Sequence, residues 1–430
     1  MKKTSITVML LILTLLVSAC GGSNNNSASK SENGGTNGAG GEKVTLSLYS
    51  TASDGSSQEV LKKVIADYQV ENPNVNIEVQ YPGADYDSVL KMMMASNELP
   101  DLFDTHGWAM TRYKDYVADL SGEAWTADLS DTIKNVLVDD TGKVYALPLN
   151  ESKDGITFNA NVLEKYGVEI PTTIDEMIAA GEKIKAESNG SVIPFFYAGQ
   201  DSWTIGQFFD YFANSLLISP EPNQAQALLD NTFDWNNWNP LAEKFKELHD
   251  KGLMNEDVLT AKYSDIPALF AQDQIAFVMT GPAFTADALN LNPDLKFGIM
   301  PVPAMVEGDA PNFSGGERNT LAAWKDSKNL EEAKKFLAFY AKPEYMKMMA
   351  EATGSPAAFK SVTADLGQAT QYYEQFKDIR VFPYFDRLYL PSGMWDVITT
   401  KGQEILAGGI TAQDFSDAMK QNVDRLLSQQ

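Results

Sequence analysis

The sequence predicts an α/β protein of two or more domains or lobes, built on an open parallel sheet flanked by helices. Its 430 residues exceed what one hydrophobic core of roughly 150 residues requires, so a second domain or lobe is expected. Hydrophobic residues make up 44% of the chain and charged residues 21%, which is the balance of a soluble globular protein. Strand and helix patterns also alternate along the chain, and this alternation is typical of parallel sheets with helices on their faces.

The first folded segment shows the pattern of a strand, a helix and a second strand. Apolar residues alternate with other residues over 44–49 and again over 75–79, as expected for two strands. Between these strands, apolar residues from Val60 to Tyr68 recur at helical spacing until Asn72-Pro73 ends the helix. Such a βαβ unit has parallel strands. A helix over 86–97 and a short buried strand over 99–104 extend the same sheet.

Helix and strand signals continue to alternate further along the chain. Thr173 and Glu176 form a capping box, which predicts a helix over 174–186. A helix over 264–271 turns into a strand over 275–280, and Gly281-Pro282 ends that strand. The remaining predicted elements are a strand over 297–301 and amphipathic helices over 330–341, 345–352 and 415–427, of which the second is capped by Gly354.

The composition excludes several classes of function. Lys and Arg number 34 against 58 Asp and Glu, and the resulting net charge of −24 repels phosphate backbones, so nucleic acid is excluded as a partner. One Cys and two His do not suffice for a disulfide framework or for a zinc site with several His and Cys ligands. The sequence contains no phosphate-binding loop, dinucleotide fingerprint or nucleophile elbow. We therefore expect neither a metal nor a cofactor.

The N-terminus has the features of an export signal. Lys2 and Lys3 precede an apolar run over 6–17, which is too short to span a bilayer, where about 20 residues are needed. The run ends at Val17-Ser18-Ala19-Cys20, which resembles the lipobox of bacterial lipoproteins, whose Cys is lipidated after cleavage. An ordinary signal peptide that ends in Cys is the alternative. The following residues, 21–43, are mostly Gly, Ser and Asn, so they are expected to form a flexible tether.

Three loops are candidates for a ligand site because each follows a strand of a predicted sheet. Ligands of open α/β sheets bind at the carboxyl ends of the strands, and this rule selects the loops 50–54, 104–108 and 281–284. Trp203 and Trp395 lie in polar loops among carboxylates and amides. An indole in such a setting suits stacking on the apolar face of a sugar ring, although packing in a core is the alternative for any Trp.

Two other functions are compatible with these residues. Paired carboxylates equally suit an extracellular glycoside hydrolase. Abundant carboxylates in a cleft without aromatic residues would favour a polyamine or peptide ligand, whereas Trp residues in loops favour a sugar. The residues alone leave these alternatives open.

A series of short segments occurs in a specific order along the mature chain. These segments are 66–75, Leu99-Pro100-Asp101-Leu102, 142–148, 158–167, 171–176, 276–282, 334–344 and 405–409. In this order and spacing they resemble the family of extracellular solute-binding proteins, family 1, of ABC importers, which are carbohydrate binders similar to maltose-binding protein. The resemblance covers nearly the whole mature chain.

The resemblance implies a two-lobed periplasmic-binding-protein-like fold (type II), in which each lobe is an open, mostly parallel sheet flanked by helices. Hinge crossovers joining the lobes are expected near 150–153, 279–281 and 316–319. Residues 44–150 and 282–318 would form the first lobe, and 151–281 and 319–430 the second. A signal peptide (1–19) and a lipidated Cys with its tether (20–43) would precede them.

The resemblance also implies a function and a set of ligand contacts. The protein would be a monomeric lipoprotein on the extracellular face of a bacterial cell membrane, anchored through Cys20 alone. It would capture a sugar or oligosaccharide between its lobes and deliver it to ABC permease subunits without acting as an enzyme. Phe284 stands where the maltose binder has a Trp, which leaves the sugar open. The expected ligand contacts are Asp54, Asp104, Trp108, Glu151, Asp201, Trp203, Phe284, Arg318 and Trp395.

Overall fold

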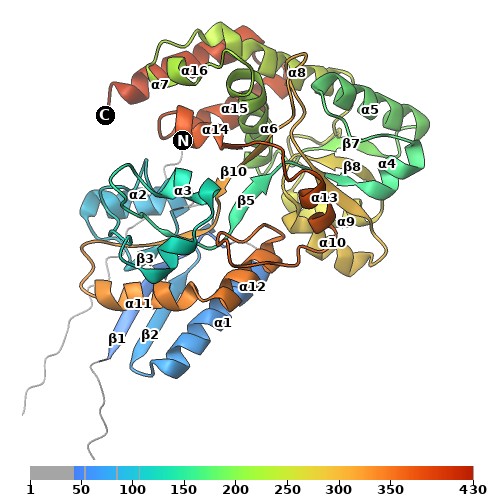
Figure 1. Ribbon diagram of the computed structural model, residues 1–430. Helices are drawn as coiled ribbons and strands as arrows, with labels where there is room; N and C mark the ends of the chain where they lie inside the picture. The colour runs from blue at the N-terminus through green and yellow to red at the C-terminus, as the bar shows by residue number, and fades with distance from the viewer. Residues whose placement is uncertain (1–42, 53–54, 84–85, 106, 430) are drawn as a thin grey trace, which may run out of the picture. The chain divides into compact units, whose positions relative to one another are not determined.

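The computed structural model describes residues 43–52, 55–83, 86–105 and 107–429. The predicted signal peptide, Cys20 and Asp54 lie outside these residues, as does the predicted tether except Lys43. The described part contains two sheets with separate hydrophobic cores and a third, smaller sheet (Figure 1). None of its helices combines the length and the apolar character that a membrane crossing requires.

The first sheet has five strands in the order β2-β1-β3-β11-β4. The strands are β1 (Val44–Tyr49), β2 (Val75–Gln80), β3 (Leu102–Phe103), β4 (Leu147–Pro148) and β11 (Thr320–Ala323). β1 pairs in parallel with β2 and β3, as the βαβ pattern predicted, whereas β11 runs antiparallel to both β3 and β4. Tyr68 of α1 (Gly55–Glu71) packs edge-on against Phe336 and Phe339 of α11 (Leu330–Tyr340), so these two helices share one core beside the sheet.

The second sheet has four strands in the order β7-β8-β6-β9. The strands are β6 (Ile156–Asn159), β7 (Ile193–Phe196), β8 (Ile275–Val278) and β9 (Phe297–Met300). Only β7 and β8 are parallel, since β6 runs antiparallel to both β8 and β9. The expectation of mostly parallel strands is therefore wrong for this sheet. In the register, Thr157 of β6 stands opposite Val278 of β8 on one side and Ile299 of β9 on the other, and both pairings are antiparallel.

A third sheet, which we call the hinge sheet, has the strand order β12-β10-β5. Its strands are β5 (Glu151–Asp154), β10 (Phe313–Glu317) and β12 (Val381–Pro383). β5 and β10 are antiparallel, and Glu151 stands opposite Glu317 in the register. β5 follows β4 of the first sheet and leads to β6 of the second, whereas β10 leads from the second sheet back to β11 of the first. The hinge sheet therefore carries two of the crossings between the larger sheets.

The crossings confirm two of the three predicted hinge positions and correct the third. The chain passes between the two larger sheets near 150–153 and 316–319, as expected, but residues 279–281 lead from β8 toward α10 (Thr285–Leu291) on the side of the second sheet. The third crossing follows α12 (Pro343–Thr353) and leads to α13 (Ala369–Gln375). The resemblance placed a hinge near 279–281, but Phe284 packs edge-on against Phe270 of the core beside the second sheet, so the chain stays on that side.

The predicted assignment of residues 282–318 and 319–430 to the two lobes is also wrong, because each segment contains a strand of the other lobe's sheet. Residues 282–318, expected in the first lobe, contain β9 of the second sheet, and residues 319–430, expected in the second lobe, contain β11 of the first. Below, the first lobe means the described residues of 43–149 and 320–359, and the second lobe means 156–313 and 369–429, as the buried cores divide them.

The helices largely follow the predicted signals. Thr173 and Glu176 form the expected capping box at the start of α5, and Gly354 takes the left-handed conformation at the end of α12. The helices of the first lobe are α1 (Gly55–Glu71), α2 (Tyr86–Ser96), α3 (Asp131–Leu137), α11 (Leu330–Tyr340) and α12 (Pro343–Thr353). Those of the second lobe are α4 (Ala160–Tyr166), α5 (Ile174–Glu187), α6 (Trp203–Ala213), α7 (Ala225–Leu229), α8 (Asn239–Asp250), α9 (Ile266–Ala271), α10 (Thr285–Leu291), α13 (Ala369–Gln375), α14 (Phe385–Tyr389), α15 (Met394–Leu406) and α16 (Ala412–Leu427).

Candidate functional site

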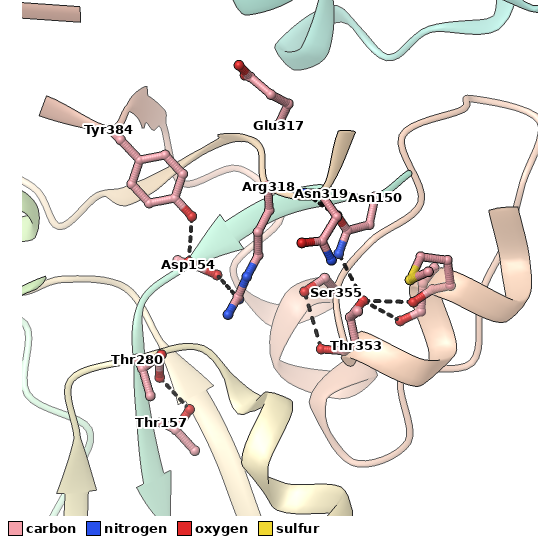
Figure 2. Close-up of polar contacts among 12 residues, drawn as sticks. Asn150, Asp154, Thr157, Thr280, Glu317, Arg318, Asn319, Thr353, Ser355 and Tyr384 are labelled. Atoms are coloured by element: carbon pink, nitrogen blue, oxygen red, sulfur yellow. Dashed lines mark hydrogen bonds and ion pairs between the residues drawn. The ribbon is translucent and has the colours of Figure 1, made fainter. Parts of the chain in front are cut away.

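The three crossings are tied to one another by the side chain of Asn150, which follows β4. Its Nδ2 donates a hydrogen bond to Oγ1 of Thr353 at 2.9 Å, and its Oδ1 accepts one from the backbone N–H of Asn319 at 3.1 Å. Asn150 is fully buried. Figure 2 shows this amide between the ends of the two other crossings. The amide of Asn150 therefore links all three crossings.

Asp104 follows β3 and is held within the first lobe. It is 3% exposed, and its Oδ1 accepts hydrogen bonds from the backbone N–H of Thr320 at 3.3 Å and from the Thr320 hydroxyl at 3.0 Å. The hydroxyl of Thr51 donates to its other oxygen. A small cavity lined by Ser50, Asp104, Asn319 and other residues lies beside it. The loop after β3 thus reaches the residues of a crossing, and its expected contact with ligand stays a prediction.

Trp108 lies in the same loop, and two arginine side chains lie over its ring. The guanidinium carbon of Arg112 lies 4.2 Å from the centre of its ring, and that of Arg387 lies 5.3 Å from it. Arg112 belongs to the first lobe and Arg387 to α14 of the second. Trp108 is half-buried. Because it contacts an arginine of each lobe, this indole takes part in the contact between the lobes.

Arg318 and Asp154 form an ion pair in the hinge. Nη1 of Arg318 lies 3.7 Å from Oδ1 of Asp154, and the hydroxyl of Tyr384 donates to Oδ2 of Asp154 at 2.5 Å (Figure 2). Asp154 is 5% exposed, and Nη1 of Arg318 is buried without a hydrogen-bond partner. A hydrogen-bond acceptor on a ligand suits this donor, because a buried donor without a partner lowers the free energy of unfolding by about 1–3 kcal/mol.

Asp201 and Trp203 come together at the start of α6. The backbone N–H of Tyr263 donates to Oδ2 of Asp201 at 2.7 Å, and the rings of Trp203 and Tyr263 lie 5.0 Å apart. Trp203 is half-buried. The carboxylate of Asp201 therefore holds the loop that carries the tyrosine, and the two aromatic rings contact each other at an interplanar angle of 55° on the second lobe.

Trp395 lies at the start of α15 and packs on α6. A Cβ atom added to Gly206 would lie 3.0 Å from Cζ2 of Trp395. The indole therefore packs against α6 at a position where only glycine leaves room for it. Trp395 remains half-buried. Its contact with α6 accounts for part of the ring, and its expected contact with ligand stays a prediction.

Glu151 and Phe284 are held by protein contacts. The hydroxyl of Ser130 donates to Oε2 of Glu151 at 2.5 Å, while burial raises the pKa of this carboxyl. Phe284 is 3% exposed and belongs to the core of the second lobe. Its ring is enclosed by that core, and its expected contact with ligand stays a prediction.

The sequence reasoning missed several residues of the hinge. Asp154, Glu317, Tyr384 and Arg387 all lie within this polar region, and none was among the expected contacts. The hydroxyl of Tyr384 and the carboxylate of Asp154 are 230 residues apart in the chain. No spacing rule connects positions at that distance, although the acidic residue in a strand next to the predicted hinge 150–153 was a signal that could have been used.

Comparison with known proteins agrees with this architecture. Residues 53–347 match the family model of the bacterial extracellular solute-binding proteins. The melibiose/raffinose/stachyose-binding protein MelE of Bacillus subtilis (strain 168) is 45% identical over 388 residues, which are 90% of this chain and 91% of MelE. The multiple sugar-binding protein of Streptococcus mutans serotype c is 25% identical over 408 residues, or 89% of this chain and 92% of that protein.

A solved structure shows the same two-lobed fold. The crystal structure of a sugar transporter from Bacillus licheniformis in complex with stachyose has a TM-score of 0.85 and 47% sequence identity to this chain. The similarity covers 89% of this chain and 100% of that one. The match to the family model and the similarity along the whole folded part lead to one conclusion: the chain belongs to the bacterial extracellular solute-binding proteins.

Proposed function

We propose that this protein is the substrate-binding component of an ABC importer for melibiose, raffinose and stachyose, sugars that share an α-1,6-linked galactose. It captures the sugar at the hinge between its lobes and delivers it unchanged to the permease subunits. The observation that carries the proposal is the 47% identity, over the full length of the relative, to a protein solved with stachyose. The name of MelE, at 45% identity, points to the same sugars.

The hinge supplies the chemistry that an oligosaccharide needs. Trp203 and Tyr263 provide aromatic surface, and sugars present apolar C–H faces that stack on such rings. Arg318 and Asp154 provide a donor and an acceptor side by side, which suits pairs of neighbouring hydroxyls. A sugar that stacks on these rings of the second lobe and bonds to polar groups at the crossings would contact both parts of the molecule, and such contacts favour closure of the lobes.

The carboxylates at the site suit binding better than hydrolysis. Asp104, Glu151 and Asp201 each accept hydrogen bonds from neighbouring groups of the protein. These bonds hold loops and crossings in place, whereas a glycoside hydrolase needs one carboxyl free to donate a proton and another to attack or activate water. The protein is therefore proposed to release its ligand without chemical change.

A panel of ligands tests this function. We expect melibiose, raffinose and stachyose to raise the unfolding temperature, whereas maltose and spermidine leave it unchanged. A sugar at 100 times its Kd adds about 2.7 kcal/mol to the free energy of unfolding. Calorimetric titration measures each Kd, and chromatography of the recovered sugar checks that it is intact. Stabilisation by spermidine alone would exclude the sugar proposal, and cleavage of stachyose over time would show that the protein is a glycoside hydrolase.

The anchor is proposed to be a lipid on Cys20, with the permease as the partner at the membrane. This proposal rests on the sequence Val17-Ser18-Ala19-Cys20 and on the Gly-, Ser- and Asn-rich tether after it. Two acyl chains on one Cys suffice for stable attachment. We expect Cys20→Ser to move the protein from the membrane fraction to the medium, with unchanged affinity for sugar. Retention of the Cys20→Ser protein in the membrane fraction would argue against the lipid anchor.

A further inference from the structure

Arg387 extends from α14 of the second lobe to two other parts of the chain. Its guanidinium carbon lies 4.0 Å from the ring centre of Tyr384 and 5.3 Å from that of Trp108 in the first lobe. Its Nη1 donates a hydrogen bond to the backbone carbonyl of Glu317, in the hinge sheet, at 2.8 Å. One side chain therefore contacts the second lobe, the hinge and the first lobe at the same time.

The backbone of the first lobe is shaped to receive this guanidinium. Gly107 has a φ of +84°, and a Cβ atom added there would lie 2.0 Å from Nη1 of Arg387. Any residue with a side chain at this position would be strained in its backbone and would also displace the cation. The contact between Arg387 and the first lobe thus depends on a glycine that the turn itself also favours.

A second arginine makes the reciprocal contact. Nε of Arg112 donates to the hydroxyl of Ser392 in the second lobe at 3.1 Å, and its Nη1 pairs with Asp87 of α2 at 2.8 Å. The side chain of Arg112 is only 10% exposed, and its guanidinium lies over Trp108. The indole therefore carries one cation from each lobe.

We propose that Arg387, together with Arg112, is a latch that holds the lobes together through Trp108 in the absence of sugar. Every contact of the latch is made between protein groups, so the latch acts on the empty protein. It sets the fraction of molecules that are closed before ligand arrives. This regulation of the site rests on the proposed function, because the apparent Kd for sugar rises as the closed fraction falls.

The distance between the lobes measures the latch directly. The sequence has one Cys, so spin labels at Val70→Cys and Leu291→Cys in full-length Cys20→Ser protein report one distance. Val70 on α1 and Leu291 on α10 are 82% and 63% exposed. We expect Arg387→Met to shift the population of the sugar-free protein roughly 5- to 30-fold toward the longer distance, as the loss of a partly buried cation–π contact predicts. Affinity for stachyose should fall by no more than the same factor.

Two further variants separate the latch from other effects. Arg425→Met removes the same charge from α16, where the guanidinium of Arg425 donates hydrogen bonds only to Asn422 among the described residues, and it should leave the distance unchanged. Gly107→Ala keeps every charge but displaces the guanidinium, so it should reproduce the shift of Arg387→Met. Identical distances in Arg387→Met and Arg425→Met would overturn the latch. A shift in the sugar-free protein supports it even if stachyose fails to bind, since that failure concerns the proposed function alone.

Discussion

Replacing Glu317 by Gln should flatten the pH dependence of stability and make the protein more stable than wild type by about 3 kcal/mol at pH 8. Glu317 ends β10 in the hinge sheet and is 2% exposed. Its side chain points away from the cluster of Arg318 and Asp154 (Figure 2). Burial raises the pKa of this carboxyl to about 7; Arg387 opposes the shift, and the charge of Asp104 adds to it. The folded protein therefore keeps this proton at pH values where the unfolded chain releases it.

The direction of the effect follows from the two pKa values. The unfolded carboxyl ionises near its ordinary value of 4.5, whereas the folded one ionises near 7. The stabilisation by the neutral form is complete below about pH 4.5 and is lost as the pH rises through about 7. Gln resembles the neutral acid, so the variant should match wild type at pH 4.5 and exceed it above pH 7. Urea unfolding at pH 4.5, 6, 7 and 8 measures the difference.

A matched variant separates this effect from a general change in charge. Glu243 lies on the exposed side of α8, and Glu243→Gln removes the same charge at the surface. Its stability should follow that of wild type at every pH to within about 0.5 kcal/mol. If Glu317→Gln also stays parallel to wild type between pH 4.5 and 8, the buried carboxyl does not hold a proton and the explanation is wrong.

Replacing Asp154 by Ala should lower the free energy of unfolding by about 3 kcal/mol, at the lower end of the range for breaking buried ion pairs. The change leaves the cation of Arg318 without its carboxylate and the hydroxyl of Tyr384 without its acceptor. The side chain of Arg318 is 27% exposed, and its ion pair is long at 3.7 Å. Water therefore recovers part of the loss, which is why the lower end of the range applies.

The variant Asp154→Asn distinguishes the two contributions. An amide oxygen still accepts the hydrogen bond from Tyr384 but no longer neutralises Arg318. We expect it to lose about half of the stability that Ala loses and to weaken the binding of stachyose. Urea unfolding and calorimetric titration of the two variants provide the test. Equal losses for Ala and Asn would assign the whole effect to charge, whereas a loss below about 0.5 kcal/mol for Ala would show that the pair contributes nothing.

Local signals in the sequence predict the elements whose causes are local. The alternation over 44–49 and 75–79, the capping box at Thr173 and the glycine at position 354 each produced the expected element. In these cases neighbouring side chains determine the backbone, either by periodic burial or by satisfying free backbone groups.

The arrangement of the site depends on contacts that no local signal encodes. Gly281-Pro282 breaks a strand whether or not a hinge follows, and only the packing of Phe284 on Phe270 shows that the chain stays in one lobe. Arg387 is an unremarkable charge in a short helix until the fold brings Trp108 to it from the other lobe. The resemblance to a family predicted the two lobes and several of the polar residues. It did not predict which groups of this chain those residues contact.

The position of β11 has a consequence for the order in which the two lobes can form. β11 lies between β3 and β4, and β4 is paired only with β11 among the strands of the described first sheet. All four strands of the second sheet precede β11 in the chain and come from the continuous stretch 156–300. The second sheet can therefore assemble from one stretch, while β4 pairs only when β11 closes a loop around that whole sheet, a slow step for a chain. The sheet that begins the chain is thus the last of the two large sheets to receive all its strands, and a fragment that ends after β4 lacks the strand that would hold β4 in its sheet.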